Sequence, residues 1–258
     1  MLTVGIETSG QFGSVAVVDD GRVLASASLS HTGRRHARTL VSELKALFEQ
    51  INRSPRDAEC VAVCIGPGSF TGLRVGVVCA KTLAYAIGCR LVAVDSLEAI
   101  ATACLTDMTS VVTLVDAMRG DAFHALYNRI ALPPIEDPQT GRDASQSLRS
   151  TLANESALIR WQRQGDIGLA PWRDLIPTIP ATVPLSGPLL ASLSTEELNH
   201  ATAPPACWHP DAVQVARIGE LEAAAGRNDD LWRLEPLYIR KSAAEEKLDS
   251  AAVAMPTS

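Results

Sequence analysis

The hydrophobic pattern changes its period near residue 36, and this change limits the folds that the chain can adopt. Residues 2–8, 14–18 and 23–29 form short apolar or alternating runs separated by glycine-containing turns, which predicts three consecutive antiparallel strands. From His36 onward, apolar residues recur at three- and four-residue intervals as far as Ser54-Pro55, which predicts a helix. The chain therefore opens with a three-stranded meander followed by a helix.

Strands and helices alternate after this first helix. A strand at 60–65 leads through a glycine-rich turn into a helix at 70–87, and a strand at 91–94 precedes a helix that begins at Asp95 or Ser96. The order becomes β-β-β-α-β-α-β-α, in which helices connect the later strands in parallel. The sequence therefore predicts an α/β protein with a mixed sheet.

A second lobe begins near residue 108. Residues 111–115 and 122–127 predict a hairpin that echoes the first lobe. Residues 130–210 contain many prolines and show no complete β-α-β-α sequel, and we expect residues 165–188 within them to be irregular. Residues 211–226 predict an alanine-rich helix that ends at a glycine. The boundaries that we expect are 1–107 for the first lobe, 108–240 for a truncated second lobe whose C-terminal helix packs back on the first, and 241–258 for a loose tail.

The composition of the 258 residues disfavours several classes of function. A net charge of −6 and a pI near 5.4 provide no basic field for tight autonomous binding to a nucleic-acid backbone. No stretch approaches an uncharged membrane span, and no basic region precedes a long apolar one at the N-terminus. We expect a cytoplasmic protein with no membrane partner, whose six cysteines, none in a Cys-x-x-Cys pair, are reduced core residues.

The turn at 66–76, Gly-Pro-Gly-Ser-Phe-Thr-Gly-Leu-Arg-Val-Gly, joins a strand to a helix and allows two interpretations. Its glycines let the backbone turn sharply, and Ser69 or Thr71 can cap the helix while free N–H groups face an anion or a partner. Alternatively, the glycines only permit close helix packing. This turn alone does not decide between the two.

Several distinctive motifs occur in one order along nearly the whole chain. They are Ile6-Glu7-Thr8-Ser9, His31-Thr32 ahead of the first helix, the turn at 66–76, Ala80-Lys81-Thr82-Leu83-Ala84, Val115-Asp116-Ala117-Met118-Arg119-Gly120 and Pro236-Leu237-Tyr238-Ile239-Arg240. Together these motifs resemble those of the TsaB (YeaZ) family. The resemblance is specific through residue 127, vague from 130 to 210, and resumes at the carboxyl end.

This resemblance implies an ASKHA fold, the architecture of actin, Hsp70 and the sugar kinases, with two mixed-sheet lobes of which the second is degenerate. It also implies a non-catalytic accessory subunit that docks on a TsaD-like catalytic subunit, with a TsaE-like ATPase, to support threonylcarbamoyl transfer to adenosine 37 of tRNA. The chain would be a homodimer when alone and would contact tRNA only indirectly.

The resemblance also indicates where chemistry has been lost. In the catalytic homologue a His-x-x-x-His pair follows the strand that corresponds to 91–94, and here Ser96 and Ile100 take those places, so we expect no metal site. Glu7 stands where nucleotide-using members of the fold commonly have aspartate. A glutamate can still hold a metal-bound water, and it can also be a structural carboxylate.

Two sets of site residues follow from these comparisons of motifs. No cofactor is required by the chain itself, and ATP or ADP is expected at the partner interface. The helix at 70–87 has apolar residues on more than one face, so one face would cover the sheet and the other would meet the partner. The nucleotide or phosphate contacts that we expect are Glu7, Thr8, Ser9, Gly66, Gly68 and Ser69, and the partner-interface residues are Leu40, Leu44, Leu73, Arg74, Val77, Ala80 and Lys81.

Two enzyme classes are the alternatives. An ATP-dependent small-molecule kinase of the same superfamily would use Glu7 and the turn at Gly66 for magnesium and phosphates. A metallopeptidase would need metal ligands that the sequence does not show. Asp95 and Glu98 could form a catalytic carboxylate pair, although their position also suits the negatively charged start of a helix.

Overall fold

The computed structural model describes residues 1–29, 36–104, 108–131, 159–194 and 196–240. The first lobe is built on a sheet in the order β3-β2-β1-β4-β5. Strands β1 (Leu2–Glu7), β2 (Ser14–Asp19) and β3 (Arg22–Ser28) form the predicted antiparallel meander, and β4 (Cys60–Gly66) and β5 (Arg90–Asp95) run parallel to β1. The prediction of a mixed sheet is confirmed.

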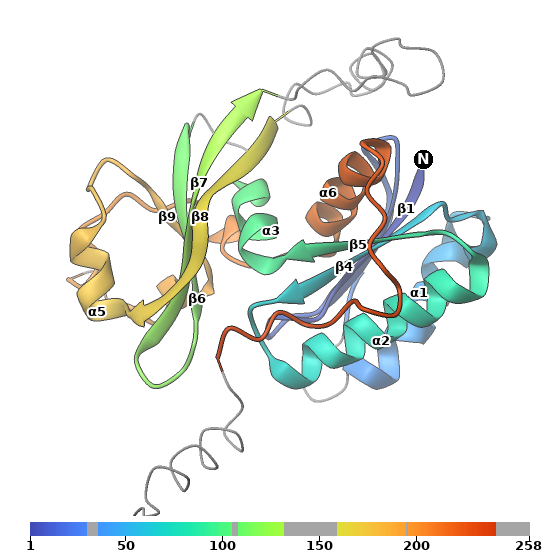
Figure 1. Ribbon diagram of the computed structural model, residues 1–258, viewed down its shortest axis with the longest axis horizontal. Coiled ribbons are helices and arrows are strands. Elements are labelled where there is room, and N and C mark those ends of the chain that lie inside the picture. The colour runs from blue at the N-terminus through green and yellow to red at the C-terminus, as the bar shows by residue number, and fades with distance from the viewer. Residues whose placement is uncertain (30–35, 105–107, 132–158, 195, 241–258) are drawn as a thin grey trace, which may run out of the picture.

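Helices cover both faces of this sheet because its strands alternate two apolar sets. Val61 and Val63 of β4 belong to the core beneath α1 (His36–Gln50) and α2 (Phe70–Ile87), whereas Cys60 and Ala62 face α6 (Ala212–Ala224). The α6 helix comes so close that a Cβ atom on Gly5 of β1 would lie 2.1 Å from the carbonyl oxygen of Ala212. The predicted C-terminal helix therefore packs on the first sheet (Figure 1).

The second lobe has a sheet in the order β8-β7-β6-β9, with α3 (Ser96–Ala103) packed between it and the first lobe. Strands β6 (Ser110–Asp116) and β7 (Asp121–Ala131) form the predicted hairpin, β8 (Ile159–Pro171) is antiparallel to β7, and β9 (Leu185–Ser186) is parallel to β6. Between β8 and α6, the described residues form the two-residue strand β9 and short helices, of which α5 (Trp172–Leu175) is one. The second lobe is thus degenerate, as predicted.

One prediction for this lobe was wrong. Residues 165–188 were expected to be irregular, but residues 165–171 are the second half of β8. Gly165 adopts a φ of +76° at the place where the pairing of β7 with β8 shifts its register, between His124 and Leu126. A bulge of this kind lets a strand continue past a glycine that would otherwise suggest its end.

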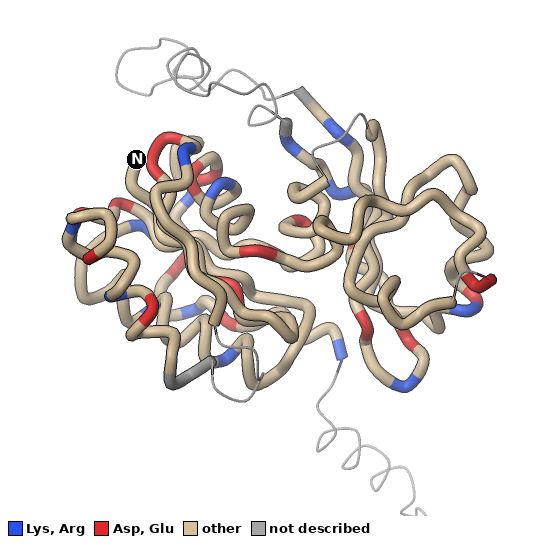
Figure 2. The backbone as a smooth tube through the Cα atoms, turned by 180° about the vertical axis from the view of Figure 1, so that it is seen from behind, with Lys and Arg blue, Asp and Glu red and all other residues tan. Residues whose placement is uncertain are grey.

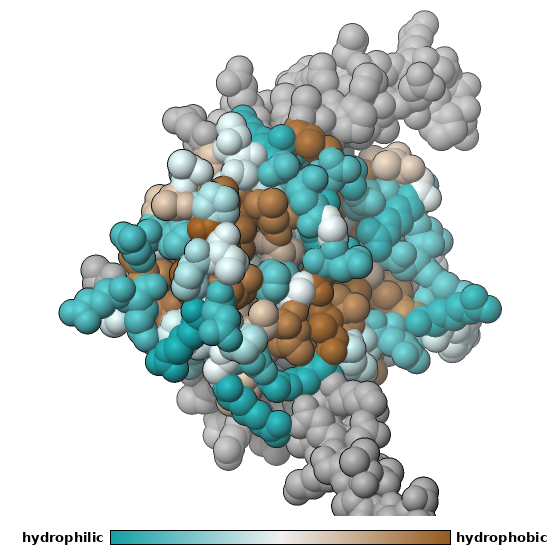
Figure 3. Space-filling model, turned by 60° about the vertical axis from the view of Figure 1, so that its left-hand side comes forward, coloured by the Kyte–Doolittle hydropathy of each residue, from teal (hydrophilic) through white to brown (hydrophobic). Residues whose placement is uncertain are grey.

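Apolar residues show through the hydrophilic surface in several separate places on the side of the molecule where the second lobe comes forward (Figure 3). The second sheet is covered there by short helices and loops, and Trp172, Ile179 and Leu193 are among the partly buried residues that pack on its core.

Lys and Arg residues are interspersed with Asp and Glu along both lobes (Figure 2). This arrangement agrees with the absence of a strong basic field in the composition.

A C-terminal strap, residues 229–240, crosses from the first lobe to the second alongside α2 (Figure 1). Its first residue pairs with β5 through Asp229 N–H and the carbonyl of Leu91 at 2.8 Å, and Leu237 N–H pairs with the carbonyl of Ile65 at 2.8 Å. Arg240 then reaches the β6–β7 hairpin. The strap therefore holds parts of both lobes together.

Some sequence predictions concern residues that the structure does not describe. The His31-Thr32 motif and the tail at 241–258 lie outside the described residues, and the lobe boundaries at 107 and 240 adjoin such segments, so these remain predictions. Among the described helices only α2 has the length and composition of a membrane span, a criterion that buried core helices also meet.

Candidate functional site

The glycine-rich turn packs directly on the loop that follows β1. Ser69 N–H donates to the carbonyl of Ser9 at 2.7 Å, and a Cβ atom on Gly68 would lie 2.4 Å from that same carbonyl oxygen. Gly66 has a φ of +107°, which side chains with a Cβ rarely adopt. Glycine is therefore required at 66 and 68 by backbone conformation and by contact with the chain itself.

The first turns of α2 make a similar approach to Thr8. The Thr8 hydroxyl donates to the carbonyl of Gly72 at 2.8 Å, and a Cβ atom on Gly76 would lie 2.2 Å from that hydroxyl oxygen. Ser69 caps the helix, since its hydroxyl accepts the N–H of Gly72 at 3.3 Å. Close packing, the second interpretation of the turn, accounts for these glycines, and phosphate binding stays a prediction.

Glu7 is completely buried at the end of β1. One carboxylate oxygen accepts the N–H of Ser9 at 2.6 Å and also the Ser9 hydroxyl, while the other oxygen has no hydrogen-bond partner. Burial raises the pKa of Glu7 to about 7, although the hydrogen bonds from Ser9 oppose this shift. A single sealed carboxylate does not fit magnesium, which takes several oxygen ligands including waters.

The residues at the start of α3 have structural roles in hydrogen bonding, core packing and helix capping. The Ser96 hydroxyl donates to the carbonyl of Pro67 at 2.5 Å, and Ile100 is fully buried in the core that the second sheet shares. Asp95 is the N-cap, accepting the N–H of Glu98 at 2.6 Å, so the helix-start interpretation of Asp95 holds. Within the described ranges, no three His, Cys, Asp or Glu side chains are grouped in a way that could hold a metal ion.

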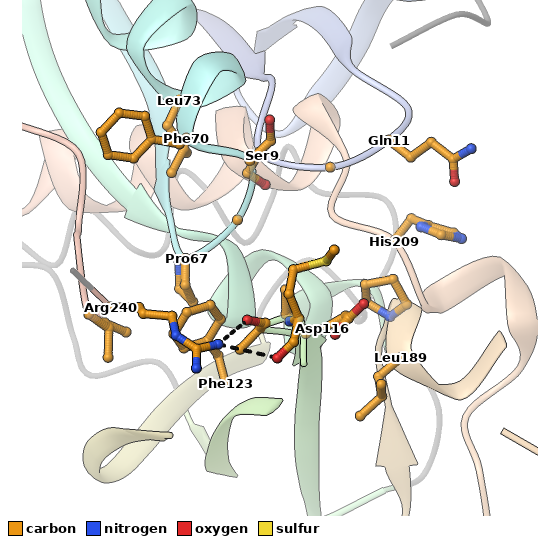
Figure 4. A pocket seen from close by; sticks show the side chains of 18 of the residues that line it. Ser9, Gln11, Pro67, Phe70, Leu73, Asp116, Phe123, Leu189, His209 and Arg240 are labelled. Carbon is orange, nitrogen blue, oxygen red and sulfur yellow. Dashed lines mark hydrogen bonds between the residues drawn. The ribbon is translucent and has the colours of Figure 1, made fainter. Parts of the chain in front are cut away.

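A cleft of about 1110 Å³ lies between the lobes, bordered by the β1–β2 loop, the glycine-rich turn, the β6–β7 hairpin and the strap (Figure 4). Of the predicted nucleotide contacts, Ser9, Gly68 and Ser69 line the cleft, whereas Glu7, Thr8 and Gly66 do not. The lining is mostly apolar and includes Phe12, Phe70, Leu73, Val115, Met118, Phe123, Leu189, Leu237 and Ile239.

The polar groups of the cleft are largely committed to the chain itself. Arg240 donates to the carbonyls of Ala117 and Met118, at 2.6 and 3.2 Å (Figure 4), and to the Asp121 carboxylate at 2.8 Å. His209 lies edge-on to Phe12, with ring centroids 5.4 Å apart, and burial lowers its pKa. These groups offer little to a polyphosphate, which favours several uncommitted cations or N–H donors.

The structure corrects five of the seven predicted partner-interface residues. Leu40, Leu44, Val77 and Ala80 are buried in the core beneath α1 and α2, and Leu73 is buried next to the cleft. Their exposed fractions range from 0% to 7%. These side chains are on the helix faces that cover the sheet, so they are not available to a partner.

The two charged residues of the predicted interface hold the strap. The Arg74 guanidinium lies 4.0 Å from the centroid of the Phe70 ring, and its Nε donates to the Tyr238 hydroxyl at 2.9 Å. The Lys81 ammonium donates to the carbonyls of Trp232 and Leu234 at 3.3 and 3.1 Å. Both cations therefore bind within the chain.

Four exposed apolar residues of α1, α2 and the strap were not among the predicted interface residues. Val41 of α1, Val78 and Tyr85 of α2, and Trp232 of the strap have exposed fractions of 66%, 62%, 68% and 75%. The Tyr85 and Trp232 rings contact each other, with centroids 5.8 Å apart. We call these four residues the exposed apolar surface. The seven-residue spacing of Val78 and Tyr85, which places them on one helix face, was the available signal.

The chain is similar to known proteins of two kinds, TsaD and TsaB. A family model described as "TsaD: tRNA N6-adenosine threonylcarbamoyltransferase" matches residues 23–132. The Escherichia coli tRNA threonylcarbamoyladenosine biosynthesis protein TsaB is 25% identical over 217 residues, covering 78% of this chain and 92% of that protein. The resemblance to the TsaB (YeaZ) family is confirmed.

Other relatives match a shorter part of the chain. The Bacillus subtilis TsaB protein is 30% identical over 127 residues, so the match spans 49% of this chain and 55% of that protein. The tRNA N6-adenosine threonylcarbamoyltransferase of Solidesulfovibrio magneticus is 39% identical over 113 residues, which is 38% of this chain and 30% of that enzyme. The alignments to these two relatives thus cover about half of the first and under a third of the second.

The solved structure "YeaZ from Pseudomonas aeruginosa" has a TM-score of 0.70 at 18% identity and covers 92% of this chain and 99% of that one. Together with the meander, the parallel strands and the second mixed sheet, this likeness confirms the predicted ASKHA-type fold. A likeness at this level of identity concerns the fold alone.

Proposed function

We propose that the chain is a non-catalytic accessory subunit in tRNA threonylcarbamoyladenosine biosynthesis. The printed name of the Escherichia coli relative supports the pathway. The use of Ser96 and Ile100 as structural residues at the start of α3 supports an accessory role, because neither residue offers an imidazole ligand. In this proposal the chain supplies a docking surface while a TsaD-like subunit supplies the metal-dependent chemistry.

The exposed apolar surface is the observation that carries the proposal. Val41, Val78, Tyr85 and Trp232 combine aliphatic groups with two large aromatic rings, which are enriched where proteins bind one another. The TsaD-like subunit docks there, and in its absence a second copy of the chain takes its place. Docking raises the activity of the partner if it favours the productive conformation of that partner.

The remaining roles follow from this arrangement. A TsaE-like ATPase joins the complex, tRNA contacts the chain only indirectly, and any ATP or ADP lies at the partner interface. The small-molecule kinase is the weaker candidate because Glu7 is sealed from the cleft and Arg240 is committed to carbonyl groups and Asp121. The cytoplasm is the expected location.

A reconstituted reaction tests the proposal. The chain, a TsaD homologue, TsaE and a source of threonylcarbamoyl-adenylate are mixed with tRNA, and the modified adenosine is measured by mass spectrometry. We expect product only when the TsaD homologue is present, and faster when this chain is added. Product formed by the chain alone would contradict the accessory role.

A variant locates the docking surface. Val78→Arg places a charge on the exposed apolar surface, so we expect it to abolish co-elution with the TsaD homologue and the stimulation of tRNA modification. Leu169→Arg is the matched control, since Leu169 is an exposed apolar residue on β8 of the other lobe, with an exposed fraction of 38%. Equal binding by Val78→Arg and Leu169→Arg would refute this surface.

A further inference from the structure

The carboxylate of Asp95 lies at the junction of the two lobes and is bound from both. It terminates β5 in the first lobe and caps α3 through the N–H of Glu98 at 2.6 Å. From the second lobe, the Tyr127 hydroxyl of β7 donates to it at 2.9 Å and the Arg163 guanidinium of β8 donates at 2.9 Å. One side chain therefore links the first sheet to two strands of the second.

The Asp95 carboxylate and the Tyr127 hydroxyl of this cluster are largely shielded from water, whereas the Arg163 side chain is partly exposed. The Asp95 side chain has an exposed fraction of 12%, and Tyr127 is 1% exposed. Burial, together with the nearby Asp95 and Glu98 carboxylates, raises the pKa of Tyr127 far above its usual range, so its hydroxyl stays protonated and donates. A rotation of the lobes would leave the buried Tyr127 hydroxyl without its acceptor and the Asp95 carboxylate with only the N–H of Glu98, and the loss of partners by buried polar groups is costly.

Two further contacts cross between the lobes at other places. The Arg160 guanidinium of β8 pairs with the Glu222 carboxylate of α6, which packs on the first sheet. At the end of the strap, Arg240 binds the β6–β7 hairpin through two carbonyls and Asp121. Contacts on separate strands and at separate ends of the second sheet restrain rotation about more than one axis.

We infer that Asp95, Tyr127 and Arg163 form a lock that fixes the relative orientation of the two lobes, so that the cleft between them keeps one shape. Hinge closure around a ligand needs a joint that can absorb a change of backbone angles. Here Asp95, which lies between β5 and α3 where such a change would occur, is hydrogen-bonded to strands β7 and β8 of the second lobe. The lock is independent of the accessory role and concerns the isolated chain.

Distances between spin labels on the two lobes test this inference. A keto-bearing amino acid is introduced at Gln50 of α1 and at Asp174 of α5, both exposed, and is coupled to nitroxides that leave the native cysteines unlabelled. Double electron–electron resonance is recorded without ligand and with MgADP. We expect one narrow distance distribution that MgADP leaves in place.

Variants test whether these residues restrain the motion of the lobes rather than only stabilise the fold. Arg163→Ala combined with Tyr127→Phe should roughly double the width of the distribution, as expected for released domain motion. Arg173→Ala is the matched control, because it removes an exposed pair with Glu197 within the second lobe, and it should leave the width unchanged. Circular dichroism confirms folding, and Arg163→Ala alone provides the milder test. A broad or ligand-shifted distribution in the unmodified chain, or a narrow one in the folded double variant, overturns the lock.

Discussion

Replacing Glu7 by glutamine should remove a large pH-dependent contribution to the stability of the fold. Burial raises the pKa of Glu7 from an ordinary 4.5 to about 7. The folded chain therefore holds a proton that the unfolded chain has lost between these pH values. The contribution of Glu7 to stability is greatest below pH 4.5, falls as the pH rises to about 7, and remains low above it. The difference between the two pKa values corresponds to about 3 kcal/mol.

Urea unfolding near pH 5 and near pH 8 measures this effect. We expect the free energy of unfolding of the unmodified chain to fall between the two conditions, and we expect the fall to be smaller by about 2.5 kcal/mol in Glu7→Gln. The control variants are Glu98→Gln and Glu220→Gln, because burial raises the pKa of each of these groups to about 7 as well. Each of these two substitutions should remove only the part of the pH dependence of stability that its own carboxyl group contributes. An unchanged pH dependence in folded Glu7→Gln would show that the carboxylate does not take up a proton on folding.

Four substitutions test the packing of the first lobe. Gly76→Ala places a methyl group against the Thr8 hydroxyl and should lower the free energy of unfolding by about 1–3 kcal/mol, measured by urea titration; no loss would contradict the close approach. Lys81→Met should speed amide hydrogen exchange in the strap, since two carbonyls lose their donor; unchanged exchange would show that Lys81 does not hold it. Val77→Arg should fail to fold, whereas Val78→Arg should keep its melting temperature, and equal melting of the two would contradict the assigned helix faces.

The parts of the fold that were predictable are those encoded over short stretches of sequence. The meander and β4 are short apolar or alternating runs bounded by turns, and the helices α2 and α6 repeat apolar residues at helical spacing. The second half of β8 was missed because Gly165 and Gly168 interrupt its pattern. Its pairing with β7 through a register shift depends on residues about forty positions away, which a local pattern does not report.

The candidate site was harder to predict for a similar reason. The α2 helix is apolar on more than one face, so its period alone did not tell Val77, which covers the sheet, from Val78, which is exposed. The sequence also gave no sign that Lys81 binds carbonyls of the strap, some 150 residues further along the chain. Residues chosen as an interface from the helix pattern therefore included both core residues and residues that hold the strap.

The glycine-rich turn shows why a motif can be identified correctly while its role is left open. Glycine is needed wherever the backbone must come close to another group, and that group can be a phosphate or a second stretch of backbone. In this chain the carbonyl oxygens of Thr8 and Ser9 would lie 2.0 and 2.4 Å from Cβ atoms on Gly72 and Gly68. Backbone contact therefore accounts for these glycines without any anion, and the motif by itself is no evidence that the chain binds nucleotide.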